Sequence, residues 1–144
     1  MEPNQRAQLL KDEYIMLQQF YEDIDSKGLT IKSWAITVAL ASIGAGIVQR
    51  KEILLAGFIA SLMFWYLEAY WRGLSHFFAR RIQDIERIFQ MENLTDEAPL
   101  QVYSTWNREY EKVKDQTFRY MFKRTTLLPH VAISGFTLFL YFWF

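Results

Sequence analysis

The chain of 144 residues contains no cysteine, and this absence removes several classes of function at once. Without cysteine there is no disulfide scaffold, no thiol nucleophile and no thiolate metal site. There is also no excess of charge, because 16 lysines and arginines balance 16 aspartates and glutamates. The overall charge therefore gives no indication of a nucleic-acid partner.

The sequence also lacks the common motifs of enzymes. It has no glycine-rich loop that would cradle a phosphate, no two histidines four residues apart that would bind a metal, and no serine in a nucleophile-elbow setting. We therefore expect no catalytic residue, no cofactor and no bound metal, and a protein that is not an enzyme.

One pair of residues resembles a catalytic motif. Arg124 and His130 have the R-x5-H spacing of the RNA-cleaving motif in HEPN-type helical nucleases. The pair straddles the start of an apolar run, so His130 would lie about one and a half helical turns inside a membrane, out of reach of RNA. We interpret the match as a coincidence.

Charge is absent from three long runs, which organise the sequence. No charged side chain occurs in 33–48, in 53–67 or in 125–144. The last run has 20 residues, enough at about 1.5 Å per residue to cross the roughly 30 Å hydrocarbon core. The first two lengthen once Lys32 and an interfacial Glu68 are counted, and only four residues separate them. We predict three membrane-spanning helices, of which the first two form a tight hairpin.

The predicted fold is all-α: a polytopic membrane protein with three transmembrane helices and a cytoplasmic helical bundle or stalk. Its single domain would consist of a cytoplasmic amphipathic helix (1–28), a transmembrane hairpin (29–71), a cytoplasmic helical hairpin (72–124) and a third transmembrane helix (125–144). The first apolar run begins after more than thirty residues, with no basic start or small-residue cleavage site before it, so we do not interpret it as a signal peptide.

Lysines and arginines predict the orientation. Basic residues gather before the first span, after the second and before the third: Lys27, Lys32, Arg72, Arg80, Arg81, Arg119, Lys123 and Arg124. The hairpin tip has only Arg50 and Lys51. By the positive-inside rule, the N-terminus and the central segment are cytoplasmic and Phe144 lies at the opposite face. We expect a multi-pass protein of the cell inner membrane.

Three segments outside the spans have the periodicity of amphipathic helices. Their apolar positions are Leu10, Tyr14, Leu17, Tyr21 and Ile24; then Phe78, Ile82, Ile85 and Phe89; then Tyr103, Trp106, Tyr110, Val113 and Tyr120. In the second segment, the charged side chains Arg80, Arg81, Asp84, Glu86 and Arg87 are expected on other faces. We expect the three to bundle, with one continuous helix from about Ile53 to Met91, roughly 60 Å long.

The stretch FWYLEAYWRG (64–73) combines aromatic and ionisable residues at the end of the second span. Trp65, Tyr66, Tyr70 and Trp71 are typical of an interfacial aromatic belt, and this is the interpretation we favour. Glu68 and Arg72 are four residues apart and can pair on one helical face. The alternative is a polar site or pore lining within the membrane, formed by Glu68, Arg72, His76 and His130, because ionisable groups at that depth often carry function.

Small residues recur at four-residue spacing in the first two spans, which lets helices approach closely. They are Ala35, Ala39, Ala41, Ser42, Ala45 and Gly46 in the first span and Ala56, Gly57, Ala60 and Ser61 in the second. Their simplest use is to pack the hairpin on itself, and the alternative is contact with another subunit.

The segments LTIKSWAITVALASIGAGI and LMFWYLEAYWRG resemble small multi-pass bacterial membrane proteins of uncharacterised function. The tight two-span hairpin joined to cytoplasmic helices is similar in architecture to SLATT-type effectors. That resemblance implies an oligomeric pore that acts in prokaryotic nucleotide signalling and antiviral defence. The third span at the C-terminus departs from the SLATT pattern.

Two functions remain open. In the first, copies of the chain assemble into a homo-oligomer that forms a channel-like or membrane-perturbing effector, controlled through the cytoplasmic helices. In the second, the chain is a membrane-anchored scaffold or accessory subunit whose stalk binds a cytoplasmic or membrane protein. Membrane lipids are partners in both, and nucleic acid in neither. A pore would use the polar residues at membrane depth, which are Thr37, Ser42, Ser61, His130, Ser134 and Thr137.

Overall fold

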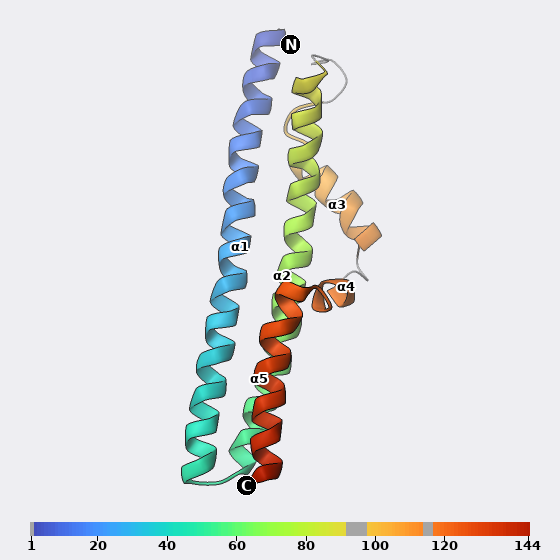
Figure 1. The fold of residues 1–144 in the computed structure, drawn as a ribbon. Helices are drawn as coiled ribbons and strands as arrows, with labels where there is room; N and C mark the ends of the chain where they lie inside the picture. Colours follow the sequence, from blue (N-terminus) through green and yellow to red (C-terminus); the bar gives the residue numbers. More distant parts are fainter. Residues whose placement is uncertain (1, 92–97, 114–116) are drawn as a thin grey trace.

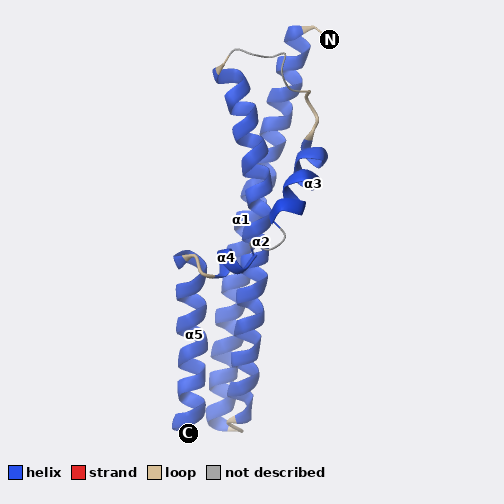
Figure 2. Cartoon of the chain, turned by 90° about the vertical axis from the view of Figure 1, so that its right-hand side faces the viewer, coloured by secondary structure: helices blue, strands red, loops and turns tan. Residues whose placement is uncertain are grey.

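Two long helices form an antiparallel hairpin that runs the whole length of the molecule (Figure 1). The computed structural model describes residues 2–91, 98–113 and 117–144. The hairpin consists of α1 (Pro3–Val48) and α2 (Glu52–Gln90), and α5 (Arg124–Trp143) lies along its lower half. Two shorter helices, α3 (Val102–Val113) and α4 (Thr117–Met121), lie to the right of α2 in Figure 1 and on the side that faces the viewer in Figure 2. The predicted all-α fold is confirmed, with three helices long and apolar enough to cross a membrane.

The two hairpin helices are uninterrupted. The 46 residues of α1 extend over about 69 Å and the 39 residues of α2 over about 58 Å. Pro3 occupies the first turn of α1, where its missing N–H costs no hydrogen bond, and the next proline comes only at position 99. The predicted continuous helix from about Ile53 to Met91 is confirmed. The structure has no helix boundary at residue 28 or 71, where the predicted parts meet.

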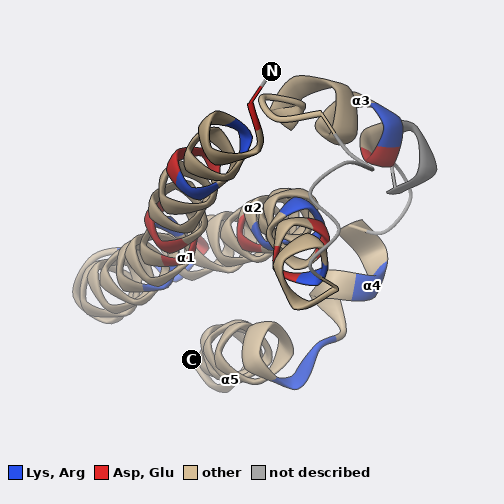
Figure 3. Ribbon diagram, turned by 90° about the horizontal axis from the view of Figure 1, so that it is seen from above, with Lys and Arg blue, Asp and Glu red and all other residues tan. Residues whose placement is uncertain are grey.

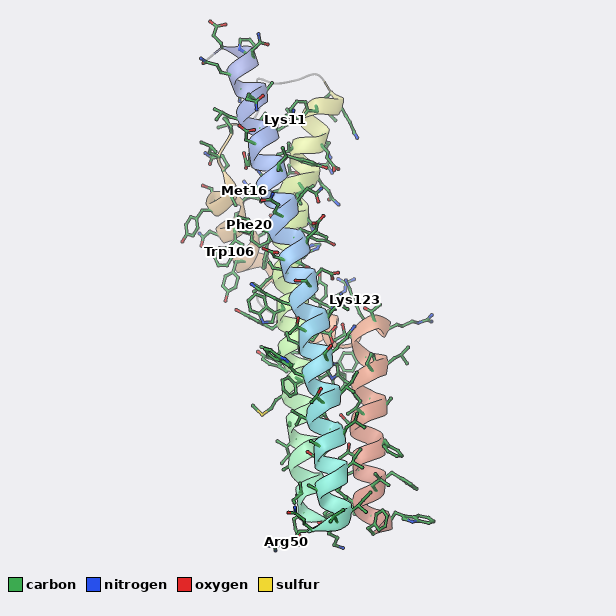
Figure 4. All side chains as sticks on the ribbon, turned by 90° about the vertical axis from the view of Figure 1, so that its left-hand side faces the viewer. Lys11, Met16, Phe20, Arg50, Trp106 and Lys123 are labelled. Carbon is green, nitrogen blue, oxygen red and sulfur yellow. The ribbon has the colours of Figure 1, made fainter. Side chains whose placement is uncertain are left out.

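We call 3–31 of α1 and 69–90 of α2 the stalk, and 33–48, 53–67 and 125–143 the membrane half. Seen from above, charged residues (blue and red) lie on the stalk, α3, α4 and the start of α5, whereas the rest of α5 has none and is tan (Figure 3). The side-chain view places Lys123 at the start of α5 and Arg50 at the opposite end of the membrane half, in the hairpin turn (Figure 4). The charges thus separate the two halves as the sequence indicates.

The third predicted amphipathic segment is not one helix. Its apolar positions divide between α3, which ends at Val113, and α4, which begins at Thr117. Tyr103 is exposed, whereas the rings of Trp106 and Tyr110 each lie 6.1 Å from the ring of Phe77 in α2. α3 therefore packs on the stalk through aromatic contacts along only part of the predicted seam.

The stalk has a core of large apolar side chains. Its buried members are Leu10, Leu17, Ile82, Ile85 and Ile88, and Tyr14, Phe78 and Val102 pack against them. Complete burial of each such side chain stabilises the folded state by about 1.5–3 kcal/mol. The predicted seams are largely confirmed, but Tyr21 and Phe89 point outward and are exposed.

Arg81 was expected on a face of its helix other than the buried apolar seam, and that expectation is wrong. Its side chain is buried and binds the buried carboxylate of Glu13 on α1. Arg81 Nε donates to Glu13 Oε1 at 2.9 Å and its Nη2 to Oε2 at 3.3 Å. The backbone N–H of Leu100 donates to the same Oε2 at 2.7 Å, and Arg81 Nη2 donates to the carbonyl of Ala98 at 3.2 Å. This ion pair therefore also fixes the chain just before α3.

The membrane half is packed through small and hydroxyl-bearing residues. A Cβ atom at Gly57 would lie 2.5 Å from Ser42 Cβ, and one at Gly46 would lie 2.6 Å from Leu54 Cγ. Between α2 and α5, the hydroxyls of Ser61 and Ser134 are 2.6 Å apart and form a hydrogen bond. Such close approaches are typical of helices that associate in a membrane, where apolar burial gives little preference for protein over lipid.

Candidate functional site

Glu68 lies at the point where the stalk meets the membrane half, and it is the centre of a polar network. Its side chain is completely buried between α1, α2 and α5. Arg72 Nε, one turn along α2, donates to Glu68 Oε1 at 2.7 Å. Lys32 Nζ of α1 lies 3.2 Å from the same oxygen, and His130 Nε2 of α5 lies 2.9 Å from Oε2. We call these four residues the Glu68 network.

A proline in α5 explains why Lys32 reaches this helix. Pro129 has no N–H, so the carbonyl four residues earlier, that of Thr125, loses its usual helical donor. Lys32 Nζ donates to this free carbonyl at 2.9 Å. At membrane depth, a backbone group released by proline needs such a replacement partner. One ammonium group therefore binds both the backbone of α5 and the carboxylate of α2.

His130 also packs against the ring of Trp65. The indole ring of Trp65 stacks on the imidazole with the ring centroids 6.5 Å apart, and its N–H donates to the carbonyl of Met121 at 3.1 Å. When His130 Nε2 carries the proton that Glu68 accepts, Nδ1 is left as an acceptor. Nδ1 and the hydroxyl of Thr126 are both buried, and neither has a hydrogen-bond partner among the described residues.

The charges of the network are only partly removed from water. Glu68 and His130 are fully buried, whereas the side chains of Lys32 and Arg72 remain 19% and 24% exposed. Arg72 Nη1 also approaches Asp25 of α1 at 3.6 Å. A buried carboxylate needs hydrogen-bonded cations to offset its lost hydration, and here three helices supply the donors. The network therefore holds α1, α2 and α5 together at one level.

The predicted site residues divide into two groups. The structure brings Glu68, Arg72 and His130 together, and the predicted pairing of Glu68 with Arg72 is confirmed. His76 does not touch Glu68; it lies one turn beyond Arg72, where its Nε2 accepts a hydrogen bond from Arg80 at 3.4 Å. Burial, followed by the charges of Arg80 and Lys123, lowers the pKa of His76, and Glu109 opposes this in part.

The sequence interpretation missed Lys32 as a member of the network. A signal was present, because Lys32 and Glu68 each lie 18 residues from Arg50 in the hairpin turn. Two helices of equal rise that leave one turn bring such residues to the same height. The role of Thr125 was also foreseeable, since Pro129 identifies the carbonyl that lacks a helical donor.

The aromatic residues of 64–73 have two roles. Tyr66 and Tyr70 are exposed and Trp71 is half-buried, with Lys27 Nζ 5.0 Å from the centre of its ring. These three positions suit the predicted belt at an interface. Trp65 instead turns inward and packs against His130 and Phe122. The alternatives of belt and site thus apply to different residues of the same stretch.

The predicted helix-packing residues point in different directions. Ala35, Ala39, Gly46, Gly57 and Ser61 are buried within the hairpin and against α5, and Ser42 is half-buried there. Ala41 and Ala56 are exposed, and Ala45 and Ala60 are half-buried. The first group packs within the hairpin or against α5, while Ala41 and Ala56 face away from the described chain.

Arg124 and His130, which have the spacing of a nuclease motif, do not form a joint site. Arg124 is exposed, whereas His130 is fully buried beside Glu68. Among residues 2–91, 98–113 and 117–144, no group of three or more His, Asp or Glu side chains is placed to hold a metal ion.

Comparisons with models of protein families, with curated proteins and with solved structures find no match to this chain. The chain has three candidate membrane spans, consistent with a multi-pass membrane protein.

Proposed function

We propose that the chain is a non-enzymatic protein of the inner membrane that forms an oligomer and changes membrane permeability under the control of its cytoplasmic helices. The observation that carries this proposal is the Glu68 network. Ionisable groups at membrane depth are costly, and they usually serve ion pathways, proton relays or gates. This network joins all three candidate spans at the level where the stalk begins.

In this proposal the Glu68 network is a latch that holds α5 against the hairpin. Among the described residues, three hydrogen bonds join α5 to the hairpin: His130 to Glu68, the Thr125 carbonyl to Lys32, and Ser134 to Ser61. Two of these three belong to the network. Because α1 and α2 continue from the stalk into the membrane half, a displacement of the stalk would act directly on Lys32 and Glu68.

The conducting path would form between copies of the chain. In the most apolar 18-residue stretches of α1, α2 and α5, only 28%, 28% and 22% of each stretch is buried within one chain. Most of the surface of these stretches is therefore free to meet lipid or further copies. Release of α5 would expose Glu68, Lys32 and His130 to such an interface. The architectural resemblance to SLATT-type effectors adds a role in prokaryotic defence to the proposal.

Ion flux from liposomes, measured together with the mass of the embedded particle, tests this function. Glu68→Gln keeps the shape of the side chain and removes the negative charge that binds Lys32, Arg72 and His130. We expect the variant to leak faster than the wild type at the same oligomeric mass. Glu52→Gln, at the exposed hairpin tip, is the matched control and should behave as wild type. A tight Glu68→Gln oligomer would refute the latch.

A membrane-anchored scaffold is the second candidate, and the direction of the membrane-depth polar groups favours it. Ser61, Ser134, Thr137 and His130 are buried inside the protomer. Thr37 is exposed, but its hydroxyl donates to the carbonyl of Ser33 in its own helix at 2.9 Å. A monomer or dimer that stays tight in every variant would support this function, in which the stalk binds a protein partner without conduction.

A further inference from the structure

A polar cavity of about 210 Å³ adjoins the Glu68 network on its stalk side. It opens between α1, α2, α4 and the start of α5, and its lining includes Asp25, Arg72, Ser75, His76, Tyr120 and Lys123. We call it the boundary pocket. Its two cations, Arg72 of α2 and Lys123 just before α5, are far apart in the sequence, and the fold brings them together just outside the membrane half.

The boundary pocket has more positive than negative charge. Lys123 Nζ lies over the ring of Tyr120, 4.0 Å from its centre, and no carboxylate of the described residues is within salt-bridge distance of it. Arg80, next to the pocket, has His76 as its hydrogen-bond partner rather than an acid. Asp25 is the acid in the lining, and its side chain is 60% exposed at 3.6 Å from Arg72.

Burial and the neighbouring positive charges both lower the pKa of His76. After burial, the largest causes that lower its pKa are the charges of Arg80 and Lys123, and the charge of Glu109 opposes them. Because Nε2 accepts from Arg80, the other ring nitrogen of the imidazole carries the proton and is a donor. The pocket therefore offers hydrogen-bond donors and positive charge, which are the groups that bind an anion.

We propose that the boundary pocket binds a phosphate group, held by Lys123, Arg72 and His76. Guanidinium and ammonium groups are the usual partners of phosphate in proteins. The cavity is smaller than the roughly 300–1,000 Å³ of pockets for drug-sized ligands, so it suits a phosphate or a headgroup rather than a whole nucleotide. Basic pockets between transmembrane helices on the cytoplasmic side bind anionic headgroups.

Two sources can supply this chemistry: the headgroup of an anionic phospholipid, and free inorganic phosphate. The exposed rings of Tyr66 and Tyr70 indicate that the pocket lies near the level of the headgroups. Arg72 belongs both to the pocket and to the Glu68 network, so the bound phosphate lies one side chain from the latch. Binding of phosphate does not depend on the proposed ion conduction, and thermal unfolding measures binding alone.

Thermal unfolding of the full chain in detergent, at constant ionic strength, tests the site. One arm adds phosphatidylglycerol, a second adds inorganic phosphate, and phosphatidylcholine controls for the lipid itself. We expect a saturable rise in the unfolding temperature of the wild type. Saturation by phosphatidylglycerol beyond the phosphatidylcholine control identifies a lipid headgroup, and saturation by inorganic phosphate identifies the free ion.

Lys123→Gln should weaken the apparent affinity about five- to tenfold, as expected for the loss of one charged contact, and Lys123→Arg should restore it. Lys51→Gln is the matched control, because Lys51 also lies over a tyrosine ring, that of Tyr141, but at the other end of the membrane half. Lys123 is exposed, so its replacement leaves the packing intact. The proposal is overturned if no ligand stabilises the wild type, or if Lys51→Gln weakens binding as much as Lys123→Gln.

Discussion

Glu13 and Glu68 are both buried carboxylates between α1 and α2, but their surroundings differ. Glu13 meets a single arginine in a two-pronged contact, and the backbone N–H of Leu100 completes its hydrogen bonds. The two oxygens of Glu68 bind Lys32, Arg72 and His130, which come from three helices. The side chains of Lys32 and Arg72 stay partly exposed. The first arrangement is a buried pair between α1 and α2 that also binds the backbone before α3, whereas the second depends on the relative position of α1, α2 and α5.

The two halves also differ in how their helices are held together. The stalk buries leucine and isoleucine, because water on its outside makes apolar burial favourable. The membrane half relies on Gly57 against Ser42 and on the hydrogen bond between Ser61 and Ser134. The same pair of helices is thus held together differently in the stalk and in the membrane half, and Glu68 lies where the two meet.

The largest effect on stability is expected at Glu13. Glu13→Leu removes the buried carboxylate that binds Arg81 at 2.9 Å, which should lower the free energy of unfolding by about 3–5 kcal/mol. The double variant Glu13→Leu/Arg81→Leu should recover part of this loss, since both members of the buried pair are then replaced by apolar side chains. Glu52→Leu, on an exposed pair with Arg50, should cost less than about 1 kcal/mol. Unfolding in mixed micelles measures all three, and equal losses for Glu13→Leu and Glu52→Leu would contradict a closed, buried pair.

A smaller loss is expected at Glu68. In Glu68→Leu, the side chains of Lys32 and Arg72 can turn to water, so the main penalty is the buried His130 that has lost its partner, about 1–3 kcal/mol. The same unfolding experiment measures it. A loss larger than that of Glu13→Leu would show that Glu68 is held as rigidly as Glu13, and the comparison between them would fail.

Packing in the membrane half is tested at its glycines. Gly57→Ala should lower the free energy of unfolding by about 1–2 kcal/mol, because the new methyl would meet Ser42 Cβ, which can move only with its helix. Gly46→Ala should cost less, since the atoms of Leu54 that it meets can rotate away. Gly44→Ala has open space and is the control. If all three variants unfold alike, close approach at Gly57 is not what holds the hairpin.

The smallest expected effect is a dependence on pH at His76. Its folded-state pKa is lowered, so between that value and the ordinary value of about 6.5 the unfolded chain binds more protons than the folded one. The free energy of unfolding should therefore fall as the pH drops below about 6.5, and the loss is complete below the folded-state pKa. His76→Gln should flatten this part of the pH profile. An unchanged slope in the variant would assign it to another group.

The outline of the fold was predictable because the positions of the charged residues indicate the spans and the apolar periodicity indicates the packed faces of the helices. Three uncharged runs identify the three candidate spans, and the seam through Leu10 and Leu17 identifies the stalk. The division of 102–121 between α3 and α4 was not predictable, since the aromatic spacing continues across the gap. The periodicity of apolar residues indicates which face of a helix is packed, but it does not indicate where the helix ends.

The candidate site was predictable only within one helix. Glu68 and Arg72 are four residues apart, so their pairing follows from helical geometry. The contact with His130 depends on how α5 packs against α2, and the burial of Arg81 depends on the height of Glu13 on the facing helix. Charged residues are usually expected on solvated faces, and that expectation fails where a second helix supplies the opposite charge.

Ion flux controlled by a disulfide between α2 and α5 tests the latch most directly. The chain has no cysteine of its own, and the hydroxyls of Ser61 and Ser134 are 2.6 Å apart, so Ser61→Cys/Ser134→Cys places two thiols within bonding reach. In liposomes that contain this pair together with Glu68→Gln, the account predicts a tight membrane when the disulfide is oxidised and a leak after reduction. The same pair with Glu68 intact should stay tight in both states. A flux that is the same before and after reduction, at unchanged particle mass, would contradict the claim that α5 must be released.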